Sequence, residues 1–175
     1  MSTVWAEIDL EALVHNYVQL QKLATKNMTK NAGIMPVIKA DAYGHGMLEI
    51  ANVLSQQKCN FFGVSNAHEG ISLRQAGHKQ KILLFESTLP EDANMIVAHG
   101  LTPTVGSLEF AQALNREAKA SNTQLPIHIK IDTGMGRLGI DEDDVERFVE
   151  EIRKKYTQLE LEGVYTHFPL ADSDR

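Results

Sequence analysis

Residues 101–131 read LTPTVGSLEFAQALNREAKASNTQLPIHIKI, and this stretch contains the structural unit that repeats along the chain. Its two short apolar runs, 101–106 and 125–131, predict strands. The segment between them begins near Ser107 and has the length of a helix. Because two strands joined by a crossover helix lie parallel in one sheet, the stretch predicts a strand–helix–strand unit.

The same unit recurs along the chain. Other apolar runs predict strands at 35–40, 61–66, 81–86 and 160–168, which makes six strands in all. Further helices are predicted to begin near Gly46, His68, Pro90 and Asp141, and a first helix to run from its N-cap Asp9 to about Ala24. The helix after Asp141 is the clearest because its apolar residues form one stripe: Val145, Phe148, Val149, Ile152 and Tyr156.

This alternation predicts one α/β domain with a parallel sheet that is covered on its faces. Two architectures fit it, an open doubly wound sheet and a (β/α)8 barrel. The pattern of strands and helices alone favours neither of them. In both, the active site lies at the C-terminal ends of the strands.

The composition is that of an ordinary globular protein, with 43% apolar and 23% charged residues. A net charge of −6 argues against sequence-independent binding of nucleic acid or anionic lipid. Since no stretch resembles a signal peptide or reaches the roughly 20 apolar residues of a membrane span, we expect a cytoplasmic protein. Cys59 is the single cysteine, which excludes an internal disulfide and predicts a buried, unreactive thiol.

Ionisable residues lie near the ends of three predicted strands. Lys39 ends the first strand, although a surface lysine that covers apolar neighbours is the commoner interpretation of such a position. His128, Lys130 and Asp132 share one face of the fifth strand. That face would be solvated in an antiparallel sheet, but between crossover helices it is enclosed, which favours a polar site. His167 ends the sixth strand, and both a core histidine and a site residue fit it.

Two motif matches are set aside. Gly134–Gly139 fits the G-x-G-x-x-G pattern of dinucleotide sites, but the strand before it is charged, and Arg137 stands where the backbone should face a pyrophosphate. His68-Glu69 begins like the helix of a zinc protease, but Ser72 stands where the second histidine belongs. We therefore expect neither a dinucleotide nor a metal ion.

Three longer stretches resemble the alanine racemase family in order and spacing. They are VIKADAYGHG at 37–46, HIKIDTGMGRLG at 128–139 and VYTH at 164–167, with a weaker match in FGVSNAHEG at 62–70. The resemblance implies a (β/α)8 barrel that binds pyridoxal 5'-phosphate at its mouth, and a C-terminal β-domain after it. It also implies a homodimer with shared active sites and a role in supplying D-alanine for peptidoglycan. We expect the whole of 1–175 to be part of that barrel domain, with about six of its eight strands.

The resemblance assigns roles to matching residues. Lys39 resembles the lysine that forms a Schiff base with the cofactor and acts as one of two bases at the substrate Cα. Tyr43 resembles the tyrosine that meets the cofactor phosphate, and Arg137 the arginine beside the cofactor's phenolic oxygen and the substrate carboxylate. Lys130 matches a lysine that is often carbamylated in this family and then holds Arg137. His167 resembles a histidine near the cofactor ring.

Other parts of the family's site are not expected within these residues. They are the second base, a tyrosine from the partner subunit's C-terminal domain, the arginine at the ring nitrogen and most of the phosphate-binding loop. Since residues 170–175 follow a predicted strand directly, we expect a fragment or truncated product that is inactive alone.

The alternatives are a single-barrel pyridoxal-phosphate carrier without racemase activity and a structural fragment whose motif residues no longer meet. A racemase of serine or of broader specificity is a variant of the main hypothesis.

Overall fold

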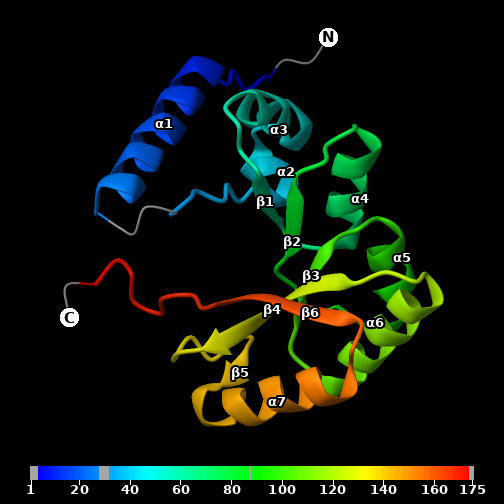
Figure 1. Ribbon diagram of the computed structural model, residues 1–175. Coiled ribbons are helices and arrows are strands. Elements are labelled where there is room, and N and C mark those ends of the chain that lie inside the picture. The colour runs from blue at the N-terminus through cyan, green and yellow to red at the C-terminus, as the bar shows by residue number, and fades with distance from the viewer. Residues whose placement is uncertain (1–3, 28–31, 87, 174–175) are drawn as a thin grey trace. The chain divides into compact units, whose positions relative to one another are not determined.

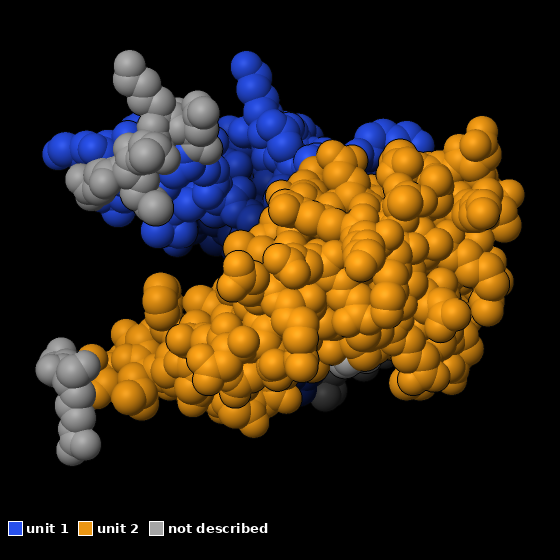
Figure 2. All heavy atoms as spheres, turned by 60° about the horizontal axis from the view of Figure 1, so that its bottom comes forward, with its two compact units in different colours: residues 1–82 blue, residues 83–175 orange. Residues whose placement is uncertain are grey.

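The computed structural model describes residues 4–27, 32–86 and 88–173 (Figure 1). The chain divides into two compact units, residues 1–82 and 83–175, which Figure 2 colours separately. Residues 1–3 and 174–175, on which part of the signal-peptide and chain-end predictions rest, lie outside the described residues.

The first unit combines helices with short strands. Its elements are α1 (Leu10–Asn27), α2 (Lys39–Gly44), α3 (Met47–Gln56), β1 (Phe61–Val64), α4 (Ala67–Gln75) and the start of β2 (Lys81–Leu84). Helix α1 begins as predicted, because Oδ1 of Asp9 accepts a hydrogen bond from the Ala12 N–H at 2.9 Å. Helix α4 begins in the same way at Asn66, whose side chain accepts a hydrogen bond from the Glu69 N–H.

The second unit holds the end of β2 and the remaining elements. They are η1 (Pro90–Asp92), α5 (Ala93–Ala98), β3 (Thr102–Val105), α6 (Leu108–Ala120), β4 (Leu125–Asp132), β5 (Ile140–Asp141), η2 (Glu142–Asp144), α7 (Val145–Lys155) and β6 (Leu159–Tyr165). Strand β4 pairs in parallel with β3, where Thr104 lies opposite His128, and with β6, where Lys130 lies opposite Tyr165. The parallel strand–helix–strand unit predicted from 101–131 is therefore confirmed.

Six strands are described, as predicted, but they are not the same six. The predicted strand 35–40 is reduced to a bridge between Val37 and Gly63, because the chain turns at Lys39. The two-residue strand β5, which sequence reasoning missed, pairs with the last two residues of β4. The predicted strand 160–168 ends at Tyr165, so His167 lies beyond it.

Apolar side chains form the core of each unit, among them the fully buried Leu54 and Phe62 in the first and Ile127 in the second. Cys59 is also buried, and its Sγ–H donates to the carbonyl oxygen of Phe61. The expected burial of Cys59 is confirmed, and burial raises the pKa of this thiol, which disfavours the reactive thiolate. In the described ranges, no helix combines the length and the apolar character that crossing a bilayer requires.

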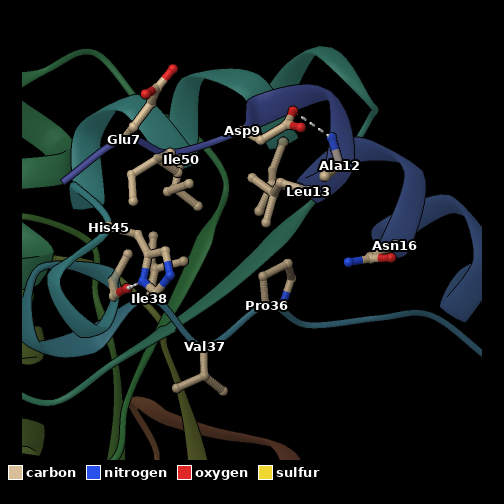
Figure 3. Close-up of a pocket in the computed structure, with 13 residues that line it drawn as sticks. Glu7, Asp9, Ala12, Leu13, Asn16, Pro36, Val37, Ile38, His45 and Ile50 are labelled. Carbon is tan, nitrogen blue, oxygen red and sulfur yellow. Dashed lines mark hydrogen bonds between the residues drawn. The ribbon is translucent and has the colours of Figure 1, made fainter.

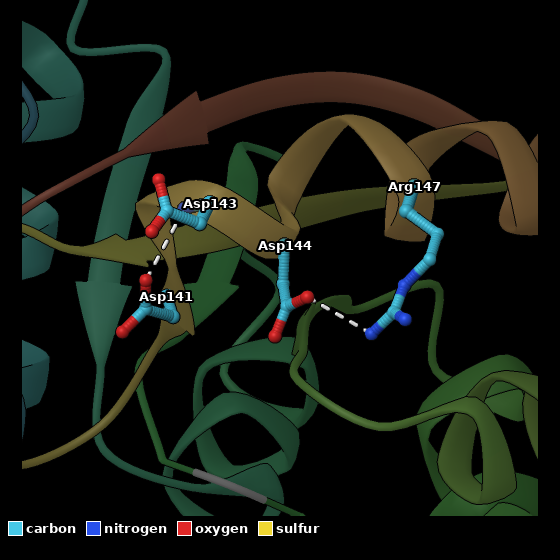
Figure 4. A network of polar contacts seen from close by, with 4 residues as sticks. All are labelled: Asp141, Asp143, Asp144 and Arg147. Atoms are coloured by element: carbon cyan, nitrogen blue, oxygen red, sulfur yellow. Dashed lines mark hydrogen bonds and ion pairs between the residues drawn. The ribbon is translucent and has the colours of Figure 1, made fainter.

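Helix α7 carries the predicted apolar stripe, with Ile152 buried. Acidic residues precede it, as expected at the positive end of a helix dipole. Oδ1 of Asp141 accepts a hydrogen bond from the Asp143 N–H at 3.2 Å, and Asp144 forms an ion pair with Arg147 at 2.9 Å (Figure 4). Because both members of that pair are exposed, it contributes at most about 1 kcal/mol to stability.

Candidate active site

The segment that carries Lys39 is a left-handed turn rather than a regular helix. Four consecutive residues, Ala40 to Tyr43, have φ between 51° and 56°. Left-handed backbone costs an L-residue roughly 1–2 kcal/mol, so a run of four persists only where other contacts hold it. The predicted strand 35–40 therefore does not continue through Lys39 and Ala40, because the chain leaves the extended conformation there.

Hydrogen bonds fix this turn from both sides. The Ile38 N–H donates to Gly63 on strand β1 at 2.9 Å, and Oδ1 of Asp41 accepts from the Met47 N–H at 2.7 Å. The Ala40 N–H donates to Oε1 of Glu69 at 2.7 Å. Sequence reasoning missed this role of Glu69, although its position three residues after the N-cap is that of a helix-capping glutamate.

Lys39 and Tyr43 both lie on the segment Lys39–Gly44. Lys39 is half-buried, and among the described residues its amine has no hydrogen bond or ion pair. Tyr43 is 62% exposed, and its hydroxyl likewise has no partner there. An amine and a hydroxyl that other side chains do not occupy are available to a ligand.

A cavity of about 400 Å³ lies between α1 and the turn, lined by Ile38, Ala42 and His45 among others (Figure 3). Its walls are mostly apolar, and Nδ1 of His45 is engaged with the Ala42 carbonyl oxygen at 2.8 Å. Lys39 and Tyr43 are not among its lining residues. The cavity is therefore not the place where these two residues would meet a ligand.

In the second unit, Lys130 is buried on β4, with 5% of its surface exposed. His128 on the same strand is half-buried, and its Nε2 lies 3.6 Å from a carboxylate oxygen of Glu162. Ile127 and Ile129 are fully buried. Neither face of β4 is solvated, as predicted, so the solvated-face alternative is wrong.

A pair of hydroxyls that sequence reasoning missed lies on the strands beside β4. Oγ1 of Thr104 donates to the Leu84 carbonyl oxygen at 2.6 Å and lies 2.9 Å from the hydroxyl of Tyr165. With its own proton used, Thr104 accepts the hydrogen bond from Tyr165. Burial raises the pKa of Tyr165.

The glycines after β4 serve the backbone, which explains the G-x-G-x-x-G match without a dinucleotide. Oδ1 of Asp132 accepts hydrogen bonds from the N–H groups of Gly134 and Gly136, both at 3.0 Å. A Cβ at Gly139 would lie 2.6 Å from the backbone nitrogen of Asp132. Arg137, at the tip of this loop, is exposed.

The Asp132 carboxylate should make the stability of this loop depend on pH. Hydrogen bonds from Gly136 and Gly134, with the charge of Lys130 as a smaller contribution, lower the pKa of Asp132 below its ordinary 3.8. When the pKa of a carboxyl is lower in the folded state than in the unfolded state, its charge stabilises the fold at any pH above the unfolded-state pKa. That stabilisation is lost as the pH falls through the folded-state pKa. Asp132→Asn should therefore be less stable than the wild type at pH 7. The denaturation curves of the two proteins should converge once the pH falls below the lowered pKa of Asp132.

A second variant separates the charge from the hydrogen bonds. Asp132→Ala removes both, so it should remain less stable than the wild type at every pH. A wild-type advantage over Asp132→Asn that persists at the lowest pH would contradict the role given to the carboxylate.

His167 lies two residues beyond β6 and is exposed. The neighbouring Thr166 has its hydroxyl 2.7 Å from that of Thr133, which fixes the backbone near it. The core-histidine alternative is wrong for the described chain.

The family model for the N-terminal domain of alanine racemase matches residues 8–175. The chain belongs to the alanine racemase family. It is 41% identical to the alanine racemase of Carboxydothermus hydrogenoformans over 98% of its length, and 40% identical to alanine racemase 1 of Caldanaerobacter subterraneus over 96%. It spans 45% and 42% of those two proteins, so it corresponds to less than half of each.

Solved structures of the alanine racemase family have the same fold. The alanine racemase of Clostridium difficile 630 has a TM-score of 0.85 at 39% identity, covering 95% of this chain and 43% of that one. The Bacillus anthracis alanine racemase with bound L-Ala-P has a TM-score of 0.86 at 30% identity, covering 98% and 43%. Of the two architectures, the match selects an incomplete (β/α)8 barrel over an open sheet.

The fold also occurs in a racemase of another amino acid. The histidine racemase from Leuconostoc mesenteroides has a TM-score of 0.81 at 26% identity, covering 95% of this chain and 43% of that one. This fold therefore does not by itself fix the amino acid that is the substrate.

Proposed function

We propose that residues 1–175 are the cofactor-binding part of a pyridoxal-phosphate-dependent racemase that interconverts L- and D-alanine. The observation that carries the proposal is the Lys39 amine, which is half-buried on a strained turn and has no partner among the described residues. Among side chains, only the primary amine of a lysine condenses with an aldehyde to a transferable imine, and an amine in a salt bridge would first have to be freed.

The residues present fit this cofactor. The unengaged Lys39 amine suits its aldehyde, and the exposed Tyr43 hydroxyl suits a phosphate oxygen. The exposed guanidinium of Arg137 suits a substrate carboxylate. When bound, the cofactor supplies an electron-accepting ring that acidifies the substrate Cα–H.

We propose the following roles for the chain's own side chains. The Nζ of Lys39 removes or returns the Cα proton on one face of the substrate, and Tyr43 donates a hydrogen bond to phosphate. Arg137 orients the substrate through its carboxylate, and His167 lies near the cofactor ring. Because racemisation needs a second base on the opposite face, we propose that it comes from a partner subunit in a homodimer.

We also propose that residues 1–175 form part of one barrel domain, which a β-domain follows in the full-length protein. A role in peptidoglycan synthesis follows from the resemblance and a cytoplasmic location from the sequence pattern, and both stay predictions. The runner-up is a single-barrel pyridoxal-phosphate carrier. A racemase for serine or for a wider set of amino acids is a variant, and the similarity to a histidine racemase favours testing it.

Activity measurements on two forms of the protein test the proposal. A full-length protein that joins these residues to the rest of a racemase of this family should convert L-alanine to D-alanine. Chiral chromatography measures this conversion. Residues 1–175 alone should leave L-alanine unchanged, because only one base is assigned within them. Racemisation by 1–175 alone would overturn the two-base assignment. Turnover of serine or histidine, but not of alanine, would replace alanine as the proposed substrate.

We further propose that Lys130 is carbamylated. The Lys130 ammonium is buried, whereas the guanidinium of Arg137 is exposed. A carbamate would replace the buried positive charge by an anion able to pair with a guanidinium in bidentate fashion. Intact-mass analysis near neutral pH should find one added carbon dioxide on Lys130. Lys130→Ala should lose most racemase activity and regain part of it with a small carboxylate such as acetate. If Lys130 is unmodified and acetate does not restore the activity of Lys130→Ala, the carbamate proposal is wrong, and Asp132 is the charge partner of this lysine.

A further inference from the structure

Glu69 lies 29 residues from the turn that carries Lys39 but contacts its backbone directly. One carboxylate oxygen, Oε1, accepts the Ala40 N–H at 2.7 Å. The other, Oε2, accepts the Ser65 N–H at 2.7 Å. One half-buried side chain thus joins the turn to the segment that follows β1.

This bond is placed where the turn needs an external partner. Ala42 donates to Ile38 at 3.0 Å and Gly46 to Asp41 at 2.9 Å, so these N–H groups are used within the segment. The Ala40 N–H points instead to Glu69. Ala40 is also the first residue with left-handed backbone, at φ 51° and ψ 52°.

The Ala40 N–H belongs to the peptide bond that follows Lys39. Since a peptide group is planar, holding this N–H also orients the Lys39 carbonyl and limits rotation about the Lys39 Cα–C bond. A charge-assisted hydrogen bond of 2.7 Å is among the stronger ones in proteins. The direction in which the Lys39 side chain leaves the backbone therefore depends on Glu69.

We propose that Glu69 is a positioning residue for Lys39, holding the Lys39–Ala40 peptide so that the amine is presented to the cofactor. The inference rests on the proposed function for its cofactor, but its hydrogen-bond part stands on geometry alone. Glu69 touches neither substrate nor cofactor on this proposal. Its helix already has Asn66 as N-cap, so the carboxylate is not needed to begin α4.

Glu69→Gln is the sharpest test. The glutamine side chain has one acceptor oxygen and one NH2 donor. It cannot accept hydrogen bonds from both N–H groups that the two carboxylate oxygens of Glu69 bind. In the full-length protein without cofactor, hydrogen exchange at the Ala40 amide should accelerate roughly tenfold or more, because the charged acceptor is replaced by a neutral oxygen or by an NH2 group. The Ala42 amide is the internal reference, because its partner is Ile38 and it should keep the wild-type rate.

The second measurement is the rate at which pyridoxal phosphate and borohydride label Lys39. We expect Glu69→Gln to slow labelling of Lys39 roughly tenfold, with labelling of the exposed Lys79 and the unfolding midpoint little changed. Glu109→Gln, which removes the same charge from the first turn of α6, should leave both the exchange and the labelling at wild-type values. If Glu69→Gln fails to fold, Glu69→Asp, which keeps the charge but shortens the reach, replaces it.

The outcomes separate the two proposals. Wild-type Ala40 exchange in a folded Glu69 variant overturns the hydrogen bond, and faster exchange with wild-type labelling of Lys39 overturns the positioning role. Absence of label on Lys39 in the wild type overturns the proposed function, whatever the exchange shows.

Discussion

Replacing Lys39 with alanine should lower the racemase activity of the full-length protein by about 1,000-fold or more. The substitution removes the amine that we propose as both the covalent link to the cofactor and one of the two bases, and a positioned base alone contributes roughly 100- to 10,000-fold. The visible absorbance of bound pyridoxal phosphate should also shift to that of the free aldehyde. Turnover of alanine and the absorbance spectrum measure the two effects.

Lys79→Ala is the matched control. Lys79 is an exposed lysine of the same unit, and we assign it no contact with a ligand. Its loss should leave the turnover and spectrum of the wild type. A Lys39→Ala protein that keeps even a tenth of wild-type turnover would show that another amine carries the chemistry.

Replacing Gly139 with alanine should have the largest effect on stability. Its φ of +138° lies in a region that side chains rarely adopt, and a Cβ there would lie 2.6 Å from the Asp132 nitrogen and 2.9 Å from the Ile131 carbonyl carbon. Such backbone strain alone costs on the order of 1–3 kcal/mol, and the contacts are with backbone that a paired strand holds in place. We expect a loss of about 3 kcal/mol or more of unfolding free energy, measured by denaturant titration.

Gly106→Ala provides the comparison in the same unit. A Cβ at Gly106 would have nothing within 4 Å, so the change should alter the unfolding free energy by less than about 1 kcal/mol. Equal stability of the two variants would contradict the close approach at Gly139.

The repeated strands and helices could be predicted because their causes are local. Apolar runs separated by helix-length segments locate β1 to β4 and β6, and side-chain caps such as Asp9 mark where helices begin. The count of six strands was right although its members changed. Strand β5 depends on Gly139 bringing two residues against β4, which no run of apolar residues signals.

The turn at Lys39 could not be predicted from local preferences. Alanine and tyrosine disfavour positive φ, and aspartate adopts it only as a single residue, so the sequence VIKADAY indicates an extended strand or a right-handed helix. The observed conformation depends on hydrogen bonds from distant segments, above all that of Glu69. Lys39 and Tyr43 were found through the resemblance, whereas Glu69 and the Thr104–Tyr165 pair are visible only in the structure.

The central claim is that Lys39 bonds to the cofactor, and peptide mapping tests it most directly. Folded protein is incubated with pyridoxal phosphate, reduced with borohydride, digested and sequenced by mass spectrometry. We expect one dominant label, on Lys39, that is lost in Lys39→Ala. A dominant label on another lysine, with Lys39 unmodified, would contradict it.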